Sequence, residues 1–127
     1  EAILLDQSGN VSEAPGENIF LVKNNKLITP SLNSSALDGI TRKSIIAMAK
    51  DMGLKSKIRK IRKTELRLAS EVFLSGTAAE ITPVVKIDRK KIGDAKVGSI
   101  TKLLMTAYSD IVMNKNKKYS QWLTKVY

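Results

Sequence analysis

Three short segments of this chain combine small residues, hydroxyls and carboxylates in a way that suits the binding of an anion. They are residues 12–18 (SEAPGEN), 37–42 (LDGITR) and 75–83 (SGTAAEITP). Glycine, alanine, serine and threonine let main-chain N–H groups approach a phosphate or carboxylate closely. One such segment alone is weak evidence, but three of them predict the loops of a cofactor site.

The second segment precedes a stretch with the apolar spacing of a helix. The unpaired N–H groups of Gly39, Ile40 and Thr41, with the Thr41 hydroxyl, then form a potential anion site at a helix N-terminus. The alternative is that Thr41 only caps the helix.

The other two segments each have a plain alternative. Residues 76–78 follow a predicted strand and offer consecutive N–H groups to an anion, although the same residues also suit a tight turn. Glu13 precedes Pro15-Gly16, a rigid turn that can present a carboxylate, although most glutamates at such places are simply exposed.

Composition limits the chemistry that the chain can perform. The 127 residues are 43% hydrophobic and 27% charged, which predicts one globular domain over residues 1–127. There is no cysteine and no histidine, so carboxylates, lysine, tyrosine, hydroxyls or a bound cofactor must act, and we expect no metal site. No apolar run approaches the roughly 18 residues of a membrane helix, so we expect a cytoplasmic protein without a membrane partner. The chain begins with Glu1 inside an apolar run, which suggests a fragment.

The net charge of +10 raises the possibility of a basic nucleic-acid-binding module. Basic residues cluster at 55–63 and again at 86–96, but no aromatic residues alternate with the first cluster. We therefore expect a solvated basic face and no nucleic-acid partner, and keep the binding module as an alternative.

The expected elements are an antiparallel β opening followed by helices and further strands. Asn24-Asn25 predicts a two-residue hairpin between strands at 18–22 and 26–29. A helix at 41–52 is expected to bury Ile45, Ile46, Ala49 and Met52. The remaining expected elements are strands at 2–6, 11–13, 55–61, 71–74 and 82–88, a helical turn at 65–69, a helix at 100–113, and a tail at 119–127 packed on the body.

Taken in this order, the three segments resemble the C-terminal half of branched-chain amino acid aminotransferases, which are fold-type IV pyridoxal-phosphate enzymes. The resemblance covers essentially the whole chain, including residues 98–102 and Trp122-Leu123 near its end. D-amino acid aminotransferases and aminodeoxychorismate lyases share the layout and remain alternatives, whereas residues 16–20 and 76–80 look most like the branched-chain group. The resemblance implies an α/β fold, the C-terminal pseudo-barrel domain with a mixed sheet and helices packed outside.

The resemblance also implies a role for each candidate residue. Pyridoxal 5'-phosphate is the expected cofactor, with the Glu13 carboxylate at its pyridine nitrogen and Leu37 against the ring face. The expected phosphate ligands lie in two loops: Gly39, Ile40 and Thr41 in one, Gly76 and Thr77 in the other. Main-chain N–H groups of Thr77 and Ala78 are expected to bind the carboxylate of an amino acid or 2-oxo acid substrate.

Two departures from the family pattern stand out. Ala14-Pro15 replaces the usual small residues after Glu13, and Asp38 replaces a common proline. Asp38 brings a negative charge close to the expected phosphate, which weakens binding unless its side chain caps the helix or pairs with Arg42.

The resemblance places the Schiff-base lysine and the phosphate-gripping arginine in a segment before Glu1. We therefore expect no catalytic residue in this chain and no transamination by the 127-residue polypeptide alone. The resemblance further implies a missing N-terminal domain, a homodimer or higher homo-oligomer, and a role in branched-chain amino acid biosynthesis.

Overall fold

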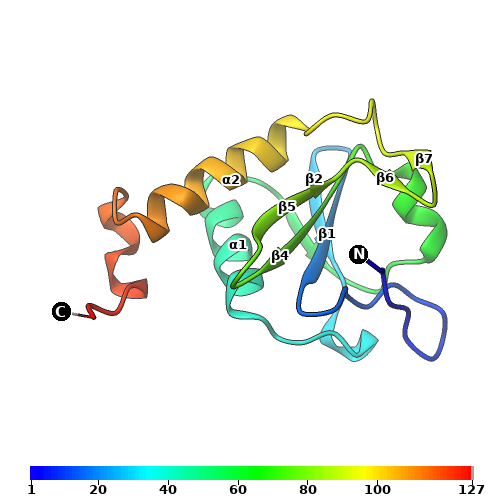
Figure 1. Ribbon diagram of the computed structural model, residues 1–127, viewed down its shortest axis with the longest axis horizontal. Coiled ribbons are helices and arrows are strands. Elements are labelled where there is room, and N and C mark those ends of the chain that lie inside the picture. Colours follow the sequence, from blue (N-terminus) through cyan, green and yellow to red (C-terminus); the bar gives the residue numbers. More distant parts are fainter. Residues whose placement is uncertain (127) are drawn as a thin grey trace.

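The computed structural model describes residues 1–126, and its centre is a five-stranded mixed sheet (Figure 1). The sheet strands are β1 (Asn18–Lys23), β2 (Lys26–Thr29), β3 (Ser56–Ile58), β4 (Glu71–Gly76) and β5 (Glu80–Val84). A small hairpin follows, formed by β6 (Lys86–Ile87) and β7 (Lys90–Lys91). The helices are α1 (Ile40–Asp51) and α2 (Ser99–Val112), with 3-10 turns η1 (Leu32–Ser34), η2 (Lys63–Leu68) and η3 (Lys117–Trp122).

The strand order β3-β2-β1-β4-β5 places β1 at the middle of the sheet. Among the strands of residues 1–126, only β2 and β3 pair in parallel, because a long crossover containing α1 connects them. The hairpin predicted at Asn24-Asn25 is confirmed: both residues have positive φ, 51° and 55°, as a tight two-residue hairpin turn requires.

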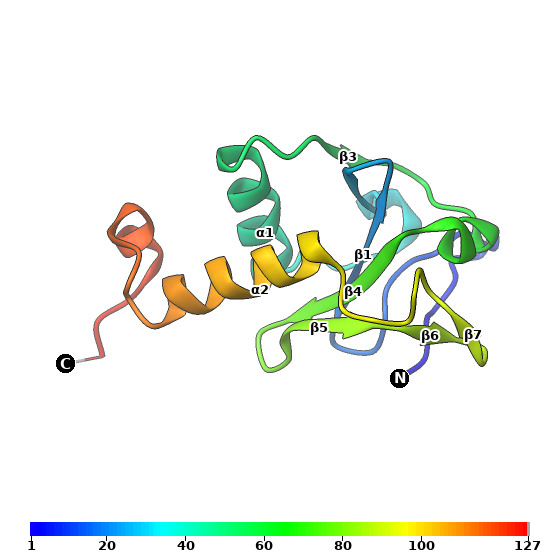
Figure 2. The same ribbon diagram turned by 90° about the horizontal axis from the view of Figure 1, so that it is seen from above.

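Each face of the sheet has its own apolar cluster, because side chains alternate along a strand. One face carries Phe20 and Phe73, stacked with centroids 5.0 Å apart, and α1 and α2 cover it (Figure 2). The opposite face carries Ile19, Leu21 and Leu74, and is covered by the N-terminal segment and η2. The sequence-based α/β expectation, a mixed sheet with helices packed outside it, is confirmed.

The two expected helices form, with small differences in their buried faces. In α1, Ile45 and Ala49 are buried as expected, whereas Ile46 is only partly buried. Met48 is buried in place of Met52, which is 39% exposed. The expectation for Met52 was wrong because α1 ends at Asp51, so Met52 lies beyond the buried stripe.

In the tail, Tyr119 packs into the core as expected and donates a hydrogen bond to Asp51. Trp122 and Val126 are exposed, so the expectation that the whole tail packs on the body was wrong. Tyr127, the last residue of the expected tail, lies outside the described residues.

Several expected strands have different bounds. Residues 2–6 and 11–13 form only an isolated bridge, Leu5 to Val11, rather than two strands. The strand expected at 55–61 is reduced to β3, although Arg59 still exchanges main-chain hydrogen bonds with Thr29 and Ser31. The Ile61 carbonyl then accepts from the Val11 N–H instead of a β2 residue. The strand expected at 82–88 is divided between β5 and β6, and β4 continues through Ser75 and Gly76, which the sequence had placed in a loop.

The basic residues of the first cluster lie along an edge of the molecule. Strand β3 is exposed over its whole length, and Lys55, Lys57 and Lys60 are exposed as well, while Ile61 turns inward and is buried. Within residues 1–126, no helix combines the length and apolarity that a membrane crossing requires.

Candidate functional site

The turn after Glu13 is rigid, as its sequence predicted. Ala14 N–H donates to the carbonyl of Glu17 over 2.8 Å, and Glu17 N–H donates back to the carbonyl of Ala14 over 3.0 Å. Pro15 and Gly16 occupy the two central positions, and Gly16 has a φ of 73°. Proline followed by a left-handed glycine is the preferred pair of a type II turn. Because the Leu4 N–H also donates to the Glu13 carbonyl over 2.7 Å, the backbone is fixed on both sides of the Glu13 side chain.

The Glu13 carboxylate contacts the second segment directly. Its Oε2 atom accepts a hydrogen bond of 2.7 Å from the Leu37 N–H, and the Asn18 side-chain amide donates one of 2.7 Å to the Leu37 carbonyl. Both peptide groups of Leu37 are thereby fixed, while its side chain stays 70% exposed. A large apolar side chain held out of the core in this way suits contact with the face of a flat ligand.

Gly39 precedes α1 at a point where no side chain fits. A Cβ atom at this position would collide with Oδ1 of Asn18, although the φ of −66° is ordinary for any residue. The Gly39 N–H was expected to be unpaired, but it donates to the Leu37 carbonyl at 2.9 Å. The structure instead gives a packing reason for glycine, which is the close approach of the Asn18 amide.

The first turn of α1 has no side-chain acceptor for its N–H groups. Among residues 1–126, no side chain caps this helix, and its first turn contains no acidic residue. Ile40 is 78% exposed, and Thr41 is buried. The N-terminal turn of α1 therefore offers donors to an anion from outside the described chain.

Helix α2 shows how this chain satisfies a similar turn internally. It also begins after a glycine, Gly98, and the Glu71 carboxylate accepts from the N–H of Ile100 at 3.2 Å and of Thr101 at 2.7 Å. The Thr101 hydroxyl donates to the same carboxylate at 2.6 Å. An Ile-Thr pair in a first helical turn thus already binds an oxyanion in this molecule. Ile40-Thr41 in α1 is the same pair of residue types, one position closer to the start of its helix, and has no such partner among residues 1–126. The α1 turn can therefore accept an anion such as a phosphate.

The third segment forms the turn between β4 and β5. A Cβ at Gly76 would approach the Gly16 carbonyl oxygen to 2.8 Å and the Glu17 Cγ to 3.3 Å, so glycine is required by close packing. Thr77 and Ala78 lie in the turn itself and are exposed. Their main-chain groups are accessible to a ligand.

The three segments meet at the start of β1. Asn18 contacts Leu37 and Gly39 in the second segment, and it pairs in register with Ser75 in the third. Gly16 and Glu17 pack against Gly76. The structure therefore brings the three segments together, although no hydrogen bond joins Thr41 to Thr77 within residues 1–126.

The negative charge of Asp38 is compensated. Its carboxylate pairs with Lys43 Nζ at 2.8 Å and with Arg42 Nη1 at 3.5 Å. The pairing with Arg42 was one of the two arrangements expected from the sequence, and it is confirmed. The contact with Lys43 was missed, although its position one residue after Arg42 was available in the sequence.

Two other residues at this junction were also missed. Asn18 was noted only as part of a motif, yet it joins the other two segments. Ser75 is buried, and its Oγ has no hydrogen-bond partner in the described part of the chain. Its neighbour across the sheet, Asn18, could be identified only from the strand register.

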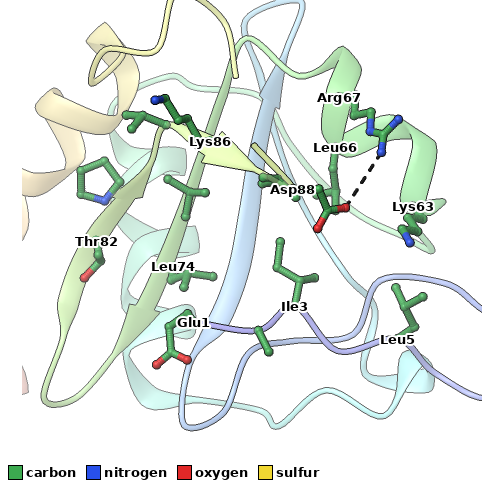
Figure 3. A pocket seen from close by; sticks show the side chains of 15 residues that line it. Glu1, Ile3, Leu5, Lys63, Leu66, Arg67, Leu74, Thr82, Lys86 and Asp88 are labelled. Atoms are coloured by element: carbon green, nitrogen blue, oxygen red, sulfur yellow. Dashed lines mark ion pairs between the residues drawn. The ribbon is translucent and has the colours of Figure 1, made fainter. Parts of the chain in front are cut away.

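A large cavity lies away from the junction at β1, although Thr82 and Pro83, at the end of the third segment, line it. It measures about 730 Å³ and opens on the sheet face opposite α1 and α2, between Ile3, Leu66 and Leu74, with the Arg67–Asp88 ion pair at its rim (Figure 3). No residue expected to bind the cofactor lines it. A smaller cavity of about 450 Å³ between α1 and α2 includes Ile40 but no other expected cofactor residue.

The fold and the junction at β1 define a class of protein: an α/β domain that presents a carboxylate, an uncapped helix N-terminus and a hydroxyl-rich turn around one point. The family model described as amino-transferase class IV matches residues 1–87, and the chain belongs to this family.

Individual relatives are similar over the whole chain. A probable branched-chain-amino-acid aminotransferase of Aquifex aeolicus is 51% identical over 128 residues, which covers 100% of this chain and 41% of the relative. The branched-chain-amino-acid aminotransferase of Escherichia coli K12 is 43% identical over 99% of this chain and 41% of the relative. This chain thus spans about 41% of the length of these relatives.

Solved structures share the fold closely. The branched-chain aminotransferase of Thermoproteus uzoniensis, solved with norvaline, matches with a TM-score of 0.95 and 44% identity, over 100% of this chain and 42% of that one. The branched-chain amino acid aminotransferase of Thermobaculum terrenum, solved in its PLP form, matches with a TM-score of 0.94 and 40% identity, over 97% and 40%. The expected fold-type IV domain is confirmed.

Proposed function

We propose that this chain is the cofactor-binding C-terminal part of a pyridoxal-phosphate-dependent branched-chain aminotransferase, which exchanges amino groups between leucine, isoleucine or valine and 2-oxoglutarate. The observation that carries the proposal is the convergence of Glu13, the uncapped α1 turn and the β4–β5 turn at the start of β1. The identity of 40–51% to branched-chain aminotransferases along this chain supports the choice of substrate class.

Each candidate residue has a part in holding the cofactor. The Glu13 carboxylate, fixed by the Leu37 N–H, accepts a hydrogen bond from the protonated ring nitrogen of the cofactor and keeps that nitrogen charged. The N–H groups of Ile40 and Thr41, together with the loop containing Gly76 and Thr77, bind the phosphate, and Gly39 lets the chain approach Asn18. Leu37 packs against the ring. When bound, pyridoxal phosphate supplies the electron sink that amino-group transfer requires.

The β4–β5 turn also serves the substrate in this proposal. Thr77 and Ala78 are exposed at the tip of the turn, so their N–H groups are available to a substrate carboxylate. A carboxylate bound by main-chain donors is held without a titratable partner, which suits both amino acids and 2-oxo acids.

The remaining parts of the proposal concern what completes the site. The lysine that bonds to the cofactor, an N-terminal domain and a second subunit come from outside this chain. The exposed side chains of Leu37 and Ile40 support this, since such apolar surface beside a binding site is normally covered. The 127-residue polypeptide alone therefore does not transaminate, and turnover by it at enzyme-like rates would refute this part of the proposal.

Substrate profiling of the complete gene product tests the activity. We expect transfer from L-leucine, L-isoleucine and L-valine to 2-oxoglutarate, with no comparable use of D-alanine and no cleavage of aminodeoxychorismate. Preference for either of the last two substrates would replace the branched-chain assignment by another activity of the same fold.

A further inference from the structure

Arg42 is a buried cation at an unfavourable position. It lies in the first turn of α1 and is 4% exposed, whereas the helix dipole favours negative charge at that end. Burial lowers the pKa of its guanidinium, and the Asp38 carboxylate only partly offsets this effect. Such a placement costs stability, so it calls for a reason other than stability.

The hydrogen bonds of Arg42 connect both ends of the loop before α1. Its Nη2 donates to the Pro30 carbonyl at 3.1 Å, and its Nη1 lies 3.5 Å from Oδ1 of Asp38. Pro30 begins the loop and Asp38 nearly ends it, so one planar side chain holds the loop to the helix. A lysine cannot make both contacts, because it has a single point donor in place of a fork.

The ion pair of Arg42 contributes too little free energy to offset the cost of burying the guanidinium. The contact with Asp38 is long, and Asp38 has a shorter contact with Lys43, at 2.8 Å. In addition, Nε of Arg42 has no hydrogen-bond partner among residues 1–126. A side chain retained only for stability would satisfy these groups better.

We propose that Arg42 is a positioning residue for the phosphate-binding turn: it fixes the loop 30–38 against α1, so that the N–H groups of Ile40 and Thr41 stay aligned on one anion. This inference rests on the proposed function of the turn. Arg42 acts through the loop and does not touch the phosphate. Together, the two cations Arg42 and Lys43 and the single anion Asp38 carry a net positive charge.

The experiment compares two ligands that differ only in the phosphate. Binding of pyridoxal phosphate and of pyridoxal to the apo form of the complete gene product is measured by absorbance for wild type, R42M, R42K and K43M. Urea unfolding of each variant is measured alongside. K43M is the matched control, because it removes one positive charge from the same turn at a side chain that is 60% exposed.

We expect R42M and R42K to weaken pyridoxal phosphate binding about tenfold. This is the effect of losing one hydrogen bond between a main-chain N–H of the displaced α1 turn and the charged phosphate. Pyridoxal binding and the urea midpoint should change little. The pyridoxal phosphate affinity of K43M should stay within about twofold of wild type, because Lys43 is exposed to screening solvent.

Wild-type affinity for pyridoxal phosphate in R42K, or equal weakening of both ligands, would overturn the inference. If R42M does not fold, R42K decides. Absence of binding by the wild type itself would instead refute the proposed function.

Discussion

The Glu13 carboxylate accepts a 2.7 Å hydrogen bond from the main-chain N–H of Leu37, 24 residues further along the chain. This contact fixes a carboxylate oxygen and the backbone of the second segment at once. It explains why a rigid Pro15-Gly16 turn follows Glu13: the turn limits where the side chain can reach. Structural and chemical roles are therefore combined in one residue.

The substitution E13Q separates these two roles. A glutamine can still accept from the Leu37 N–H through its amide oxygen, so the free energy of unfolding should stay within about 1 kcal/mol of wild type. A neutral amide cannot keep a ring nitrogen protonated, so kcat of the complete gene product should fall by about 10²-fold or more. Steady-state kinetics and urea unfolding measure the two effects. Full activity in E13Q would show that the charge is not needed.

Gly39 provides a steric prediction. The change G39A introduces a Cβ that collides with the Asn18 amide, which should cost about 1–3 kcal/mol and displace the first turn of α1. Pyridoxal phosphate affinity should fall as this turn is displaced.

The matched control is G53A at the other end of α1, where nothing lies within 4 Å of an added Cβ but φ is 74°. It should cost about 1–2 kcal/mol through backbone strain alone and leave affinity unchanged. Equal losses of affinity in both variants would argue against a local role for Gly39.

The Arg59–Glu65 pair predicts an acid-dependent contribution to stability. Two hydrogen bonds, of 3.0 and 2.7 Å, join the side chains, and they are the main reason that the pKa of Glu65 is lowered from 4.5 to about 2. A lowered pKa stabilises the fold above the unfolded-state value, so the contribution is complete above 4.5 and is lost as the pH falls through about 2. At neutral pH, E65Q should cost about 1 kcal/mol, because the pair is partly exposed.

Urea unfolding across this pH range tests the Glu65 prediction. The difference between wild type and E65Q should shrink as the pH falls from 4.5 toward 2. A difference that is constant with pH would mean that the pair is not the source of the effect.

Tyr119 predicts the opposite dependence, at alkaline pH. Burial, with the 2.6 Å hydrogen bond to Asp51, raises the pKa of its hydroxyl from 10.0 to about 12. A raised pKa means that the contribution of Tyr119 is present below 10 and lost as the pH rises through about 12. Y119F should cost about 1 kcal/mol at neutral pH through the lost hydrogen bond. It should also remove the latest phase of tyrosinate formation seen by ultraviolet absorbance. A late phase that persists in Y119F would assign it to another tyrosine.

The sequence predicted local features well, because they depend on residues close together in the chain. The Asn24-Asn25 hairpin, both helices and the turn at Pro15-Gly16 follow from backbone preferences of a few residues. Their errors lie at the ends of elements, as with Met52, where one residue decides between a buried and an exposed position.

The contacts that assemble the site were less accessible to sequence reasoning. Asn18 joins the three segments only because β1 and β4 pair in a register that sets it opposite Ser75. Glu71 caps α2 across a separation of 30 residues in sequence from Thr101. Such contacts depend on the packed fold, so the chemistry of each loop was predictable while the residues connecting the loops were not.

A crystal structure of the complete gene product with pyridoxal phosphate tests the central claim most directly. We expect the phosphate within hydrogen-bonding distance of the N–H groups of Ile40 and Thr41, and the ring nitrogen beside the Glu13 carboxylate. A cofactor bound elsewhere, such as in the cavity near Ile3 and Leu74, with the first turn of α1 facing only solvent, would contradict it.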